Sequence, residues 1–132
     1  MINHARFLAV LVMIAGSLVS PLTALAAKTI DDSAALKGVR ESMSVFLIDF
    51  TNPQKTAFYL DIIRGTHEGL VRQGVTPNMV LVFIGETVKY LSTTPADLLA
   101  MEYGEQLESI AETSRELKKL GVRMEVCAVA TR

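Results

Sequence analysis

The chain has little of what several classes of protein require. Its 132 residues include one cysteine, two histidines and no tryptophan. A single cysteine excludes a framework of internal disulfides, and so few histidines leave a zinc site short of ligands. His67 lies on the apolar face of a predicted helix, so we expect it to be packed and hydrogen-bonded rather than catalytic. The 13 basic and 14 acidic residues and the absence of a basic run argue against a nucleic-acid-binding protein. We therefore expect no metal, no cofactor and no nucleic-acid partner.

The first 26 residues have the three parts of a secretory signal peptide. Arg6 precedes an apolar run at Phe7–Ser20, and the small residues Ala24 and Ala26 follow it at the spacing of a cleavage site. An uncleaved anchor helix is the alternative, although a run of this length is short for crossing a bilayer. We expect a periplasmic or secreted protein that has no membrane span after cleavage, with residues 27–132 forming a single domain.

The rest of the chain alternates between strand and helix patterns. Met43–Phe50 and Asn78–Gly85 are apolar runs typical of strands that are buried on both faces of a parallel sheet. Between them, Asn52 and Pro53 form a strong helix start, and Gly74 is placed where a helix of this length would end. The pattern therefore predicts strand, helix and strand over this half of the chain.

The second half continues the alternation. A short helix or turn is predicted at Glu86–Leu91, a helix start at Pro95, and the strongest helical pattern at Glu105–Leu120. In that last segment acidic residues come first and lysines last, which complements the helix dipole. A final strand is predicted over Val122–Arg132, directly after Gly121. The βαβαβ order predicts an α/β fold with a mainly parallel sheet and right-handed crossovers.

The only cysteine lies in this final strand. Alternation along Val122–Arg132 places Cys127 on one face with Arg123 and Glu125. In a parallel sheet it also lies toward the carboxyl edge, where open α/β sheets bind their ligands. In an exported protein an unpaired cysteine is a buried small hydrophobe, a site of intermolecular pairing or a reactive thiol. The residues leave these three alternatives open, and Cys127 is the first candidate for chemistry.

Four further residues are candidate binding residues near Cys127. Asp49 ends the first strand, and Gly85 and Glu86 follow the second, so a parallel sheet would bring them to one edge. Asp49 is equally suited to accept a hydrogen bond in a turn or cap, and a lone Gly85 lacks the pattern of a phosphate-binding loop. Arg123 could assist a Cys127 thiolate, but a charged pair on a strand face is more often a solvated ion pair.

Three stretches of the chain carry a likeness to a known family, and they cover most of Met43–Ala130: FYLDIIRGTHEGLVRQGV, TPNMVLVFIGETVKYL and ELKKLGVRMEVCAVA. The most specific parts are the apolar strand that ends at Gly85, with the short helix after it, and the Gly-Val-x-x-Glu-Val-Cys end at Gly121–Cys127. On these residues the chain resembles the DsrE/DsrF-like family, specifically its exported branch.

The resemblance implies a three-layer α/β/α sandwich that forms homo-oligomers and carries sulfur as a persulfide on the cysteine at position Cys127. We therefore expect a thiol-dependent sulfur carrier or sulfurtransferase that works with a sulfur donor or acceptor protein. The alternative is a non-catalytic oligomeric binding module that uses the sheet edge and keeps Cys127 buried. Family members usually continue past this cysteine with a helix and a further strand. A chain that stops at Arg132 is thus expected to be short at its C-terminus or to complete its sheet across a subunit interface.

Overall fold

The computed structural model describes residues 31–129, and its elements alternate as predicted. In chain order they are β1 (Glu41–Ile48), α2 (Pro53–Arg72), β2 (Thr76–Phe83), the 3₁₀ helix η1 (Gly85–Leu91), α3 (Asp97–Lys119) and β3 (Arg123–Val126). The predicted α/β fold is confirmed. The signal peptide predicted at residues 1–26 lies outside the described residues, and no helix within residues 31–129 is long and apolar enough to cross a membrane.

The three strands form one parallel sheet in the order β1-β2-β3. Glu41 to Ile48 pair with Thr76 to Phe83 along the whole of both strands, and Val80 to Phe83 pair with β3. Both long strands begin and end two residues earlier than their apolar runs predicted. The reason is that strand bounds follow backbone pairing, whereas an apolar run also includes side chains that pack beyond the strand end.

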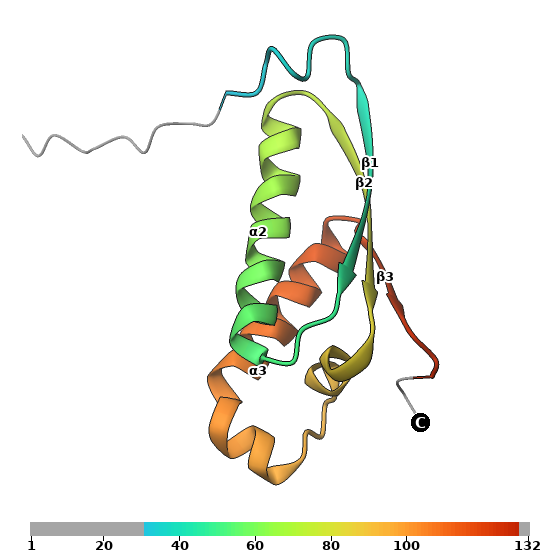
Figure 1. Ribbon diagram of the computed structural model, residues 1–132. Helices are drawn as coiled ribbons and strands as arrows, with labels where there is room; N and C mark the ends of the chain where they lie inside the picture. Colours follow the sequence, from blue (N-terminus) through green and yellow to red (C-terminus); the bar gives the residue numbers. More distant parts are fainter. Residues whose placement is uncertain (1–30, 130–132) are drawn as a thin grey trace, which may run out of the picture.

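Both long helices cover the same face of the sheet (Figure 1). Each strand pairs with the one before it, so two crossovers of the same hand place both helices on one side. The opposite face of β1 is open: Met43 is 89% exposed and Val45 73%. The expectation that the first strand is buried on both faces is therefore wrong. The second helical layer of the expected sandwich is not among residues 31–129.

The first long helix begins and ends where its sequence signals predicted. The side chain of Asn52 accepts a hydrogen bond from the backbone N–H of Lys55 at 3.2 Å, and Pro53 occupies the first helical position. At the other end Gly74 has a φ of +77°, a left-handed conformation that glycine adopts without strain. These caps fix where the chain leaves β1 and where it turns back toward β2.

The second long helix starts earlier than its strongest pattern indicated. It runs from Asp97, close to the predicted start at Pro95, and bends at Tyr103, whose φ of −129° and ψ of 24° are not helical. Gly104 follows the bend and weakens the helix there. The bend separates an N-terminal part, where Leu98 and Met101 are exposed, from the buried part that packs on the sheet.

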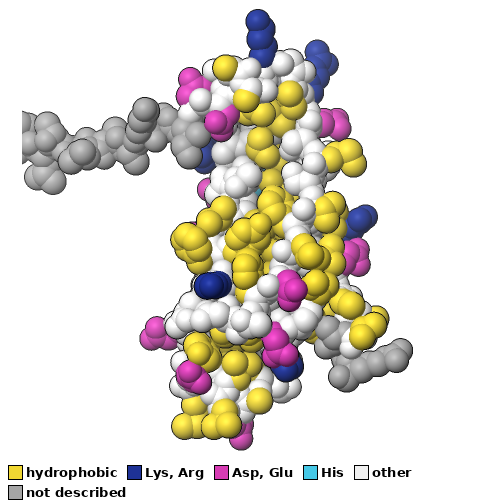
Figure 2. All heavy atoms as spheres, in the orientation of Figure 1, with side chains coloured by type: hydrophobic (Ala, Val, Ile, Leu, Met, Phe, Trp, Pro, Cys, Tyr) yellow, Lys and Arg dark blue, Asp and Glu magenta, His cyan; other side chains and the backbone are white. Residues whose placement is uncertain are grey.

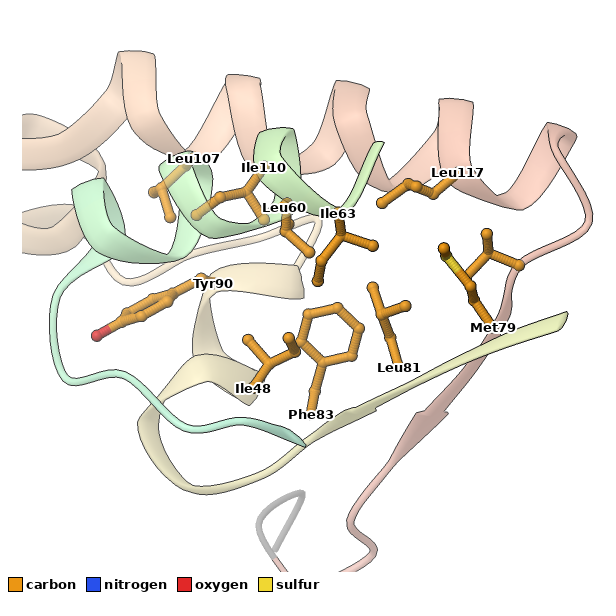
Figure 3. Packing of buried hydrophobic residues seen from close by; sticks show 11 residues of the cluster. Ile48, Leu60, Ile63, Met79, Leu81, Phe83, Tyr90, Leu107, Ile110 and Leu117 are labelled. Carbon is orange, nitrogen blue, oxygen red and sulfur yellow. The ribbon is translucent and has the colours of Figure 1, made fainter. Parts of the chain in front are cut away.

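The core lies between the covered face of the sheet and the two helices (Figure 3). Leu81 and Phe83 of β2 point from the central strand toward the helices, where Leu60, Ile63 and Ile110 meet them (Figure 3). All five side chains are fully buried. The central position of β2 explains why its inward residues form the middle of the core.

An ion pair joins the outer surfaces of the two helices. Arg64 of α2 donates to Glu116 of α3 at 2.6 Å and also contacts Asp61. The hydrogen bond to Glu116 is the main reason that the pKa of Arg64 is raised above its usual value, and Asp61 adds to the effect. Because all three groups are partly exposed, the pair contributes little free energy and mainly fixes how the helices lie against each other.

Candidate functional site

The carboxyl ends of the three strands meet at one edge of the sheet. Because all strands are parallel, Asp49, Gly85 and Cys127 each follow a strand end at this edge. Continuing the strand register by one residue aligns Asp49 with Ile84, and Ile84 with Cys127. The predicted grouping of residues at the carboxyl edge is thus present in the backbone.

A threonine that was not among the predicted site residues links the strand ends at this edge through hydrogen bonds. Thr87 is fully buried, and its hydroxyl lies 2.8 Å from the carbonyl oxygen of Ile48, to which it donates, and beside the carbonyl oxygen of Ile84. The backbone N–H of Ile84 also donates to Ile48, at 3.1 Å. Thr87 therefore ties η1 to the ends of β1 and β2. Its signal in the sequence was a hydroxyl residue two positions after the glycine that ends an apolar strand.

Gly85 and Asp49 are in direct contact. Gly85 has a φ of +57°, and a Cβ atom built on it would lie 2.7 Å from Oδ1 of Asp49. The carboxylate therefore occupies the space that a side chain at position 85 would need. Asp49 is not the cap of α2, because that role belongs to Asn52. The helix that Gly85 begins has only seven residues, too short for a helix dipole to create an anion site.

The final strand is shorter than predicted: β3 ends at Val126, and Cys127 is the first residue after it. The backbone still fixes the position of Cys127. Its N–H donates to the carbonyl oxygen of Phe83 at 3.0 Å, which extends the pairing of β3 with β2 by one residue. The cysteine is free, and its side chain is only partly buried. Continued alternation places it with Arg123 and Glu125, which pair in register with Val80 and Val82 on the uncovered face.

The charged candidates are engaged with neighbours on their own elements. Arg123 pairs with Glu125 at 3.3 Å, and Glu86 accepts from Lys89 at 2.8 Å. Arg123 begins β3, so its Cα lies about 13 Å from that of Cys127 at the rise of a strand. The structure therefore brings Asp49 and Gly85 together, with Glu86 next along the chain, and leaves Arg123 at the far end of β3.

A buried tyrosine packs behind the strand ends, on the face of the sheet that the helices cover. Tyr90 of η1 belongs to the buried core, and its burial raises the pKa of its phenol above the usual value, with the charge of Glu86 adding to the shift. The phenol therefore stays neutral over the physiological range of pH. Its role is to fill space behind the strand ends.

Two hollows on the molecule lie along α2 and not at the carboxyl edge. One of about 550 Å³ is lined by Gly65, Gly69 and Asp32, and another of about 320 Å³ by His67 and Leu120. His67 is buried as predicted, but its Nδ1 has no hydrogen-bond partner among the described residues, so the predicted hydrogen bond is not found at that nitrogen. Within residues 31–129 no three His, Cys, Asp or Glu side chains are grouped so that they could hold a metal ion.

Comparisons with known proteins identified no relative of this chain. No family model matches the chain, and neither a curated protein nor a solved structure is significantly similar to it. The residues at the carboxyl edge and the resemblance in the three sequence stretches are therefore the basis for a function.

Proposed function

We propose that the chain is an exported, DsrE-like sulfur carrier whose acceptor is the thiol of Cys127. The observation that carries the proposal is that this one free cysteine is partly exposed at the carboxyl end of a parallel sheet. Open α/β sheets bind their ligands at this edge. A buried, inert cysteine would instead lie on the covered face, among the residues of the core.

The proposed chemistry is a transfer of sulfur between thiols. The Cys127 thiolate attacks the outer sulfur of a donor persulfide, R–S–SH, and forms a new S–S bond. The S–S bond of the donor breaks, and its inner sulfur leaves as the thiolate RS⁻. The acceptor protein then attacks the outer sulfur of the Cys127 persulfide in the same way and restores the Cys127 thiolate. Each step exchanges one S–S bond for another, so no oxidant or metal takes part.

The position of Cys127 supports delivery to a second protein. It directly follows a short edge strand, where one side of the backbone faces away from β2. An acceptor can approach a residue at such an edge without opening the core. The sulfur donor and acceptor, the periplasmic or secreted location and a homo-oligomeric state are parts of this proposal.

The test is intact-mass spectrometry of the reduced protein before and after exposure to a soluble polysulfide. We expect the mass to increase by whole sulfur atoms that map to Cys127, and we expect Cys127→Ser to abolish the increase while circular dichroism stays unchanged. The unreacted protein and the denatured protein are the controls. If Cys127 gains sulfur only after denaturation, the carrier proposal is overturned, and a binding module that uses Asp49, Gly85 and Glu86 becomes the better hypothesis.

A further inference from the structure

The outer edge of β1 presents backbone groups that no other described residue pairs with. The N–H groups of Thr76 and Ile84 donate to the carbonyl oxygens of Arg40 and Ile48, so the even-numbered residues of β1 direct their backbone groups toward β2. Successive residues of a strand point to opposite sides. The N–H and C=O groups of the odd-numbered residues therefore point outward: Glu41, Met43, Val45 and Leu47.

The same odd-numbered residues carry exposed apolar side chains on the uncovered face. Met43, Val45 and Leu47 are 89%, 73% and 58% exposed. The edge and the apolar face thus meet along one strip, which consists of Met43, Val45 and Leu47. Apolar side chains also gather at the lower end of the molecule, as Figure 2 shows. The β1 strip differs from that patch because its outward backbone groups have no partner among residues 31–129.

Among residues 31–129, this edge has few of the features by which proteins protect sheet edges. Natural edge strands are short or carry charged residues, proline or a bulge. The first strand has eight residues, pairs with β2 without interruption, and carries a charge only at its first residue, Glu41. The opposite edge strand, β3, has only four residues, and Arg123 and Glu125 are two of them. The two edges of one sheet therefore differ sharply in their readiness to pair.

We propose that a second copy of this chain pairs with β1, antiparallel and around a two-fold axis near Val45. With the axis at Val45, Ser44 faces Phe46 of the copy, Met43 faces Leu47, and Ser42 faces Ile48. None of these residues is charged, so like charges meet only at the ends of the contact, where Glu41 faces Asp49. Odd-numbered residues lie opposite odd-numbered residues, so their outward backbone groups pair and the two apolar strips become continuous on one face.

The product is a six-stranded sheet whose central pair is β1 with its copy. Pairing satisfies the outward backbone groups and reduces the exposure of the apolar strip. The inference names the contact for the homo-oligomer of the proposed function, and it does not depend on sulfur chemistry. Cys127 follows β3, the strand at the other edge of the sheet, so the contact leaves it accessible in both copies.

The test is sedimentation velocity of the purified full chain over a range of concentrations, with proline placed on each edge in turn. We expect a dimer for the unchanged chain and a monomer for Val45→Pro, because proline removes one outward N–H without removing a bond to β2. Val126→Pro is the matched control. The Cys127 N–H points to β2, so that of Val126 points to the free side of β3, and the variant should still dimerise. A monomeric unchanged chain, or a dimer that loses affinity only with Val126→Pro, overturns the proposal.

A spin label at position 45 tests the contact even if Val45→Pro does not fold. We would label Val45→Cys in a Cys127→Ser background and measure the distance between labels by pulsed electron resonance. The proposed axis near Val45 predicts a short distance there and a longer one for a label at Val126, on the far edge of each copy. Absence of a short distance at position 45 in the dimer contradicts the proposal. Because neither measurement uses the thiol, their failure is distinct from failure of sulfur labelling.

Discussion

Gly85 lies where β2 turns into η1, and two separate constraints act on it. Its φ of +57° is costly for any residue with a Cβ atom, and the Asp49 carboxylate occupies the place of that atom. The sequence identified Gly85 by its position after an apolar strand. It could not show the contact with Asp49, because that contact depends on which strands pair and in which register.

Gly85→Ala and Gly74→Ala form a matched pair for separating the two constraints. Gly74 has a similar φ of +77° but open space where a Cβ atom would lie. We expect each variant to lose about 1–2 kcal/mol of unfolding free energy, measured by urea denaturation, because both pay for a left-handed conformation. The loss at Gly85 should exceed that at Gly74 only slightly, since the exposed Asp49 carboxylate can turn away. A much larger loss at Gly85 that Asp49→Ala restores would show instead that Asp49 is held in place.

Cys127 shows what a residue pattern alone leaves open. The alternation of β3 predicted its companions Arg123 and Glu125, and the register with Val80 and Val82 agrees with that prediction. Its partial exposure could not be predicted, because it depends on which face of the sheet the helices cover. The role of its thiol stays a prediction until the labelling experiment is done.

Among the elements, β1 shows most clearly how a strand at an edge differs from one inside a sheet. All eight of its residues pair with β2, yet only every second residue directs its backbone groups to that partner. The apolar run predicted a strand here, correctly. It did not predict an edge, because a run without charges is more typical of a strand buried on both faces.

Hydrogen exchange measured residue by residue should show this geometry directly. At concentrations where the chain is monomeric, we expect slow exchange for the amides of Ser44 and Phe46 and fast exchange for those of Val45 and Leu47. The reason is that only the even-numbered N–H groups are bonded to β2. Raising the concentration until the chain dimerises should slow Val45 and Leu47 as well. Uniform protection of the four amides in the monomer would contradict the assignment of the outer edge.

The bend in α3 is an element-scale feature that the sequence indicated only in part. The two predicted signals, a start near Pro95 and a strong pattern from Glu105, are the two parts of one helix joined at Tyr103. Gly104 weakened the helical pattern at that point. Whether the parts join or separate depends on packing at the bend, and the helical pattern does not contain that information.

At the scale of the whole molecule, one core lies between the sheet and the two helices. The stability of the fold therefore depends strongly on each side chain at its centre. Phe83 is fully buried in the middle of the sheet, whereas Phe58 on α2 is 67% exposed. The helix and strand order was predictable from the sequence. The order of strands in the sheet was not, and that order is what places both helices on one face.

The two phenylalanines therefore give a matched test of the core. We expect Phe83→Ala to lose about 3–5 kcal/mol of unfolding free energy, which is a large part of the roughly 5–15 kcal/mol available to a small domain. Phe58→Ala removes the same atoms from an exposed site and should change stability by about 0.5 kcal/mol or less. Thermal or urea denaturation followed by circular dichroism measures both. Equal losses for the two variants would show that the core is placed differently.

The strand order has a consequence for the way the chain is made. Each strand pairs with the strand synthesised just before it. No later segment has to insert between two strands that have already paired. β1, α2 and β2 can associate as soon as β2 has emerged from the ribosome. α3 and β3 then add to a surface that is already present. The molecule can therefore be assembled in the direction of its own synthesis.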